Sequence, residues 1–76
     1  MNQPLTYKLL LREEPEGGYT AFVPTLEGCV TYGETLDEAI SNAKEAAELY
    51  IESLKENGET VPTEQRMFEY SLTLTA

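Results

Sequence analysis

The sequence predicts an α+β two-layer sandwich with the element order β-β-β-α-β and one long helix on one face of the sheet. Apolar and polar residues alternate near both ends of the chain, at residues 5–12 and 67–75, which is typical of half-buried strands. Between these segments, residues 36–56 carry apolar side chains every three or four positions, which indicates a helix. A right-handed crossover through this helix would place it across one face of the sheet.

The first three strands are predicted to form an antiparallel meander. Residues 5–12 form the first strand, and residues 13–18 supply the proline and glycines of a turn. Residues 19–23 form the second strand, which ends at Pro24 because proline has no backbone N–H to donate. Residues 29–32 form the third strand after a short loop. Short connections between successive strands favour antiparallel neighbours.

The start of the helix is its best-defined local feature. Thr35 and Glu38 have the spacing of a capping box, in which the threonine hydroxyl accepts the Glu38 backbone N–H and the glutamate carboxylate reaches back. Asn57 and Gly58 supply a C-terminal stop. A helix of about 21 residues is roughly 31 Å long. Its apolar stripe consists of Leu36, Ala39, Ile40, Ala43, Ala47, Tyr50, Ile51 and Leu54.

One helix covers one face of the sheet, so the second face is predicted to remain open. The predicted fourth strand, residues 67–75, has an apolar side made of Phe68, Tyr70, Leu72 and Leu74. The open face would carry Leu10 and either Phe22 or the set Tyr19, Ala21 and Val23. An open apolar face favours association with another chain, whereas scattered exposed side chains need no partner. We expect a homo-oligomer, either a dimer or a tetramer.

The charge of the chain is strongly acidic. Fourteen acidic residues against five basic ones give a net charge of −9. Such a surface repels nucleic-acid phosphates and attracts basic proteins, so we expect no direct nucleic-acid partner. The alternative interpretation is that the charge only keeps a small protein in solution.

Length and cysteine content point to a single cytoplasmic domain spanning residues 1–76. No apolar stretch is long enough to span a bilayer, so we expect no membrane partner. The N-terminus lacks the basic and apolar regions of a signal peptide. One cysteine cannot form an internal disulfide, which is consistent with a reducing compartment.

The residues needed for common catalytic chemistry are scarce, and we predict no catalytic residue, no cofactor and no metal. Histidine is absent, which removes the commonest general base and metal ligand. Cys29 is better explained as a small buried hydrophobe than as a nucleophile. Asp37 is the only aspartate, and the helix start accounts for it. The glycines at positions 17, 18 and 28 lack the spacing of a phosphate-binding loop and are interpreted as turn residues.

The polar side of the predicted helix is the one candidate binding site. Its acidic residues are Glu45, Glu48, Glu52 and Glu56. Charges opposite an apolar stripe are usually only a solvated face. The functional alternative is that these four residues form an acidic strip that docks a basic protein.

Several short motifs, taken in order, resemble the HicB-like antitoxin family. They are Gly17-Gly18-Tyr19, Val23-Pro24, Leu26-Glu27-Gly28-Cys29, Gly33-Glu34-Thr35-Leu36-Asp37-Glu38-Ala39, Ala43, Ala46, and Gly58 with Val61-Pro62. The resemblance implies a truncated ribonuclease H-like fold without nuclease activity. It also implies an antitoxin that binds a small basic HicA-type toxin, which cleaves messenger RNA, and that assembles into dimers or larger oligomers. Many relatives add a C-terminal DNA-binding domain, which we do not expect after the predicted fourth strand of this chain.

Two other functions stay open from the sequence. The chain could be an orphan structural or regulatory homo-oligomer without a toxin partner. It could also be a residual metal-dependent enzyme that uses strand carboxylates, as ribonuclease H does. The lack of a second aspartate disfavours the enzyme. We therefore expect a protein-binding module rather than an enzyme.

Overall fold

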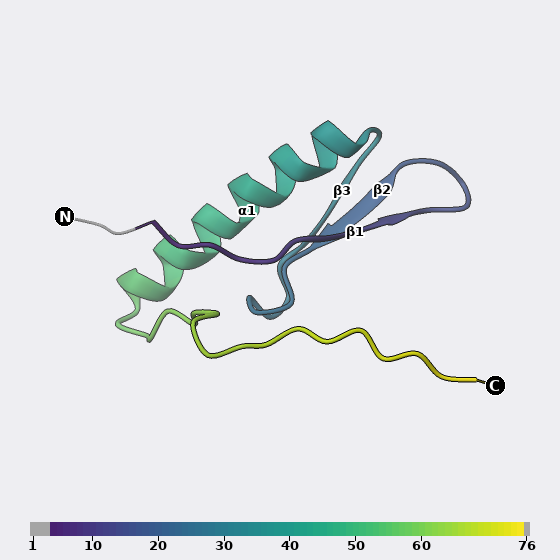
Figure 1. The fold of residues 1–76 in the computed structure, drawn as a ribbon. Coiled ribbons are helices and arrows are strands. Elements are labelled where there is room, and N and C mark those ends of the chain that lie inside the picture. The colour runs from purple at the N-terminus through teal and green to yellow at the C-terminus, as the bar shows by residue number, and fades with distance from the viewer. Residues whose placement is uncertain (1–3, 76) are drawn as a thin grey trace.

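The computed structural model describes residues 4–75 of the 76-residue chain, and this part contains three strands and one helix (Figure 1). Strands β1 (Leu10–Glu13), β2 (Tyr19–Phe22) and β3 (Val30–Gly33) form one antiparallel sheet in the order β1-β2-β3. Helix α1 (Leu36–Glu56) packs across one face of this sheet. The predicted meander and the α+β class are confirmed.

Small side chains make the contact between the helix and the sheet. Ala39 and Ala43 of α1 are buried against Ala21 of β2. A second buried cluster comes from the chain between β2 and β3, where Val23, Leu26 and Cys29 pack under the C-terminal half of α1. Leu26 is the largest side chain that is fully buried. Because the alanines add little bulk, the backbone of α1 lies close to the sheet.

The register of the sheet decides which side chains face α1. Ala21 lies beside Leu11 and Thr31, whereas Phe22 lies beside Leu10 and Val30. Neighbouring residues of a strand point to opposite faces, and Ala21 is buried under α1. The open face therefore carries Leu10 and Phe22, which settles one of the two alternatives left by the sequence.

Both ends of α1 are capped. The backbone N–H of Glu38 donates to Thr35 Oγ1 over 3.1 Å, as predicted. The Glu38 carboxylate reaches back to the backbone N–H of Glu34 at 3.0 Å, one residue before the N-cap. At the other end, Gly58 has a φ of +69°. Its N–H donates to the carbonyl of Lys55, and the next N–H donates to the carbonyl of residue 54, which is the Schellman pattern.

The first strand is shorter than predicted. Residues 5–9 are not in the sheet, and β1 begins at Leu10. In the register of β1 and β2, Lys8 would lie opposite Pro24, which has no N–H to continue the ladder. The backbone N–H of Lys8 instead donates to the carboxylate of Glu64 at 3.0 and 3.1 Å.

The fourth strand predicted over residues 67–75 is wrong, because this segment forms no ladder with β1. The chain turns at Glu64, whose carbonyl accepts the N–H of Met67 over 3.1 Å. Beyond this turn the segment passes Lys8, which pairs with Glu69, and then continues without joining the sheet (Figure 1). Alternation reports that a segment has one apolar side, but a strand also needs a neighbouring backbone to pair with.

Gly33 tests the close contact between the layers. A Cβ at Gly33 would lie 2.3 Å from the backbone nitrogen of Ala39. We predict that Gly33→Ala lowers the free energy of unfolding by about 1–3 kcal/mol, because the helix must move away from the sheet. Urea denaturation measures this change. The exposed helix substitution Ser41→Ala is the control, with an expected change below about 0.5 kcal/mol; equal effects of the two substitutions would contradict the prediction.

Thr35 tests the cap. We predict that Thr35→Ala destabilises the protein by about 1 kcal/mol, since the N–H of Glu38 loses its acceptor. Thr35→Ser keeps the hydroxyl and should stay within about 0.5 kcal/mol of the parent protein. Thermal unfolding followed by circular dichroism compares the two variants. Equal stability of the serine and alanine variants would show that the hydroxyl does not cap the helix.

Candidate protein-binding site

The predicted acidic strip lies on the outer side of α1. All four carboxylates, at Glu45, Glu48, Glu52 and Glu56, are exposed. Successive helical residues are rotated by about 100°, which places these positions on the side opposite Ala43, and Ala43 is buried against the sheet. The structure therefore places the four predicted residues on one exposed surface.

No salt bridge within residues 4–75 neutralises the strip. The ion pairs of this region are Lys8 with Glu69 at 3.5 Å and Arg12 with Glu14 at 3.0 Å, and both lie away from α1. The four carboxylates therefore face solvent without a salt-bridge partner among residues 4–75, and Lys44 and Lys55 are the basic residues on the same helix. Opposite charge on a partner would be attracted to the strip before contact.

Leu49 adds an apolar contact point that the sequence analysis missed. It lies on α1 among the four acidic residues, and 59% of its surface is exposed. A leucine outside the regular apolar stripe was the signal available in the sequence. A large apolar side chain surrounded by charge is a common arrangement in protein interfaces, where the apolar group is buried and the charges form the rim.

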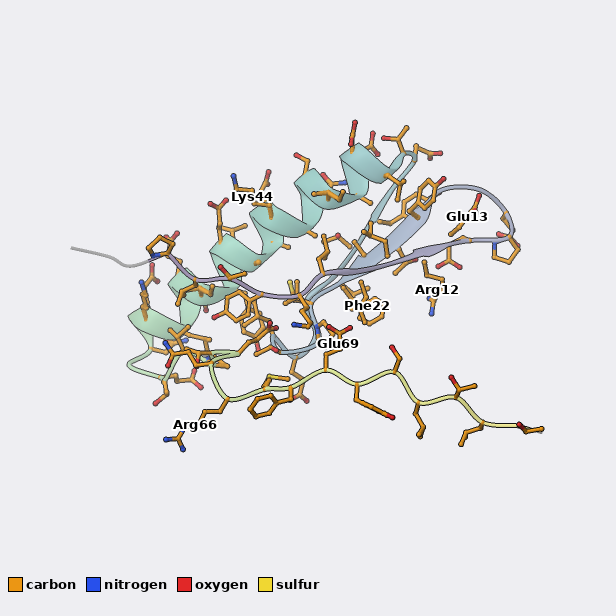
Figure 2. All side chains as sticks on the ribbon, viewed as in Figure 1. Arg12, Glu13, Phe22, Lys44, Arg66 and Glu69 are labelled. Atoms are coloured by element: carbon orange, nitrogen blue, oxygen red, sulfur yellow. The ribbon has the colours of Figure 1, made fainter. Side chains whose placement is uncertain are left out.

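The open face of the sheet is a second exposed apolar surface. Leu10 is 44% exposed, Val30 59% and Tyr32 48%. Phe22 lies between Leu10 and Val30 in the sheet and projects on the side opposite Lys44 of α1 (Figure 2). The predicted open face is thus present, and its side chains come from all three strands.

Glu64 holds three separate parts of the chain together and was not singled out from the sequence. Its carboxylate accepts hydrogen bonds from the Thr25 hydroxyl at 2.7 Å and from the backbone N–H of Lys8. The Thr25 hydroxyl lowers the pKa of the Glu64 carboxyl; desolvation opposes this shift, and the N–H and charge of Lys8 support it. Glu64 therefore fixes the point where the C-terminal segment leaves the core.

Cys29 is buried, as predicted for a small hydrophobe. Its side chain packs in the cluster under α1, and burial raises the pKa of the thiol. A thiol with a raised pKa is a poor nucleophile.

Within residues 4–75, no three histidine, cysteine, aspartate or glutamate residues lie where they could hold a metal ion. No helix in this part of the chain is long and apolar enough to cross a membrane.

Comparison with known proteins identifies the family. The family model described as "HicB_like antitoxin of bacterial toxin-antitoxin system" matches residues 7–73. The chain belongs to the HicB-like antitoxin family. The match includes α1 with its acidic strip and most of the C-terminal segment, so both belong to the HicB-like domain.

Several relatives of this HicB-like chain are UPF0150 proteins. One from Synechocystis sp. is 52% identical over 62 residues, which is 82% of this chain and 78% of the relative. Another, from Thermoplasma acidophilum, is 43% identical over 58 residues, or 76% of this chain and 84% of the relative. An uncharacterized protein of Haemophilus phage HP1 is 40% identical over 58 residues, and the match covers 44% of that protein.

The hydrogen bonds of Glu64 predict a pH dependence. A pKa below the ordinary value of 4.5 means that the carboxylate stabilises the folded protein above about pH 4.5, and that this contribution is lost as the pH falls through the lowered pKa. We predict that the Lys8 amide resonance titrates with a midpoint below 4.5 between about pH 7 and pH 3. Glu64→Gln should abolish this titration, whereas Glu16→Gln should leave it unchanged. A Lys8 amide that titrates equally in both variants would contradict the assignment.

Proposed function

We propose that this HicB-like protein is an antitoxin that binds and neutralises a small, basic, HicA-like toxin that cleaves messenger RNA. The observation that carries the proposal is the family match over residues 7–73. The net charge of −9 supports it, since a basic toxin would be attracted to such a surface. The protein would act in the cytoplasm by binding and not by catalysis.

The acidic strip is proposed as the docking surface for the toxin. Its four exposed carboxylates would speed the encounter with a basic partner. Leu49 would enter an apolar pocket of the partner and slow dissociation, because buried apolar anchors contribute most of the binding energy of an interface. The strip would thus increase the rate of association, and Leu49 would decrease the rate of dissociation.

We further propose that the three strands and the helix form a truncated ribonuclease H-like fold whose role is to bind another protein. The element order β-β-β-α supports this relationship. We also propose that the protein forms a homo-oligomer, which the exposed open face of the sheet supports. A homo-oligomer without any toxin partner is the second candidate function, and it rests on that same exposed face.

Replacing the four glutamates of the strip by glutamine, which has nearly the same shape but no charge, tests whether the strip docks the toxin. We predict that the combined change of Glu45, Glu48, Glu52 and Glu56 to Gln weakens toxin binding about tenfold or more, since each lost charge pair is worth roughly 0.2–1 kcal/mol. The binding partner for this test is a small basic protein sought among the products of the genes adjacent to this one, and isothermal titration calorimetry measures its affinity. The matched control changes Glu16, Glu27, Glu34 and Glu59, which are exposed residues outside the strip, to Gln.

The control removes the same charge, so it should weaken binding about threefold or less at physiological salt. Equal losses in the two variants would show that only net charge matters and would refute the strip as the docking site. If no adjacent basic protein co-purifies with this chain or is neutralised by it, the antitoxin function itself is refuted. The absence of a neighbouring small basic gene would favour the homo-oligomer without a toxin.

A further inference from the structure

The C-terminal arm, defined as residues 67–75, is the most exposed apolar part of the chain. Phe68 is 95% exposed, Tyr70 85%, Leu72 72% and Leu74 78%. These four side chains alternate with more polar ones, so they share one side of an extended segment. Two aromatic and two leucine side chains on one exposed stripe are typical of a surface that another protein covers.

The arm is attached to its own domain at one end only. Its root is held by the Glu64 carboxylate, which accepts the N–H of Lys8, and by the turn that joins Glu64 to Met67. The last ion pair along the arm joins Lys8 Nζ to Glu69 Oε1 at 3.5 Å. In Figure 2, Glu69 points from the arm toward the sheet. Beyond it, every residue up to 75 is exposed.

The outer edge of β1 is the place in the sheet where another strand could add. The N–H of Glu14 donates to the carbonyl of Gly18 and so continues the β1–β2 ladder. Backbone groups alternate in direction along an antiparallel strand, so those of Leu9, Leu11 and Glu13 point away from β2. The outward-pointing N–H and C=O groups of these three residues make no hydrogen bond within residues 4–75.

The other edge of the sheet is partly closed. The side chain of Asn42 on α1 donates from Nδ2 to the backbone carbonyl of Tyr32 in β3 over 2.8 Å. A strand that added to β3 would compete with this bond. An unpaired strand edge attracts a new strand because its N–H and C=O groups are already aligned. The edge of β1 is therefore the available acceptor.

We propose that the C-terminal arm of one copy adds as a strand to the free edge of β1 in a second copy, and that the second copy returns its arm in the same way. Such a reciprocal exchange produces a closed dimer with twofold symmetry. In this exchange the arm gains a strand to pair with, and the free edge of β1 gains one as well. The apolar side of each arm would lie against an otherwise exposed part of the partner.

The charge distribution favours a second copy as the occupant of this edge. Two copies that each carry a net charge of −9 repel one another over most of their surfaces. The arm holds one charged residue, Glu69, in nine positions. At the free edge of β1, the positive charges of Lys8 and Arg12 offset the negative charges of Glu13 and Glu14. The arm and this edge thus carry little net charge, so two acidic copies can meet there with little repulsion.

The buried area is also sufficient for a stable dimer. An aromatic side chain buries roughly 150–250 Å², so the four rings of two arms would bury about 600–1,000 Å². The leucines, and the partner surface that all these side chains cover, add to this area. The total exceeds the ~1,200 Å² at which specific stable interfaces begin. The exchange is independent of the antitoxin function, because no toxin takes part in it.

Mass measurement tests whether the arm holds the dimer. Light scattering after size exclusion should give twice the chain mass for the parent protein at micromolar concentration. Changing Phe68, Tyr70, Leu72 and Leu74 together to Ser should return one chain mass. The control alters the opposite side of the arm, with Glu69→Gln, Ser71→Thr and Thr73→Ser, and should remain dimeric. A monomeric parent protein, or a dimer that survives the serine changes, would overturn the proposal.

Paramagnetic broadening then distinguishes exchange between copies from pairing within one chain. A spin label is attached to Thr75→Cys in a Cys29→Ala background, and this chain is mixed with an unlabelled, nitrogen-15-enriched chain. Exchange predicts that amides of Leu9, Leu11 and Glu13 broaden in the enriched chain, which carries no label. Broadening of these amides only when label and isotope are in the same chain would show that the arm pairs with its own β1, and would refute the exchange.

Discussion

The close approach of α1 to the sheet is the contact on which the rest of this structure depends. Ala39 and Ala43 meet Ala21 with almost no side-chain bulk between the two backbones. Gly33 has no Cβ at the point where β3 turns into the helix, because a Cβ there would meet the backbone of Ala39. These four small residues fix where α1 lies on the sheet. The position of α1, in turn, decides which side chains are buried and which face solvent.

A small contact between two layers leaves much apolar surface uncovered. The fully buried side chains are mostly alanine, and Leu26 is the largest of them. A chain of this size buries only about 60% of the surface that it exposes when unfolded. The aromatic and aliphatic side chains of the open face and of the C-terminal arm lie outside this core. Association with other chains would therefore add stability that the core alone does not provide.

The sequence predicted the features that depend on local chemistry. Thr35, Glu38 and Gly58 mark the ends of α1 through their own hydrogen bonds and backbone preferences, and all three do so in the structure. The family resemblance was also correct. The sequence did not predict that residues 67–75 stay outside the sheet. Alternation of apolar and polar residues shows which side of a strand is apolar, but it does not show which strand would pair with it. Glu64 was missed for a related reason, since its partners Lys8 and Thr25 are distant in sequence.

Toxin docking and the exchange of arms use different parts of the molecule, and this separation has a physical basis. The acidic strip lies on the outer side of α1, whereas the arm begins beside Lys8, next to β1. Toxin docking needs exposed charge, and pairing between acidic copies needs a surface with little charge. One continuous surface could not satisfy both requirements, because the carboxylates that attract a basic toxin would repel a second copy. An exchange of arms would leave the acidic strips of both copies free, so one dimer could hold two toxin molecules.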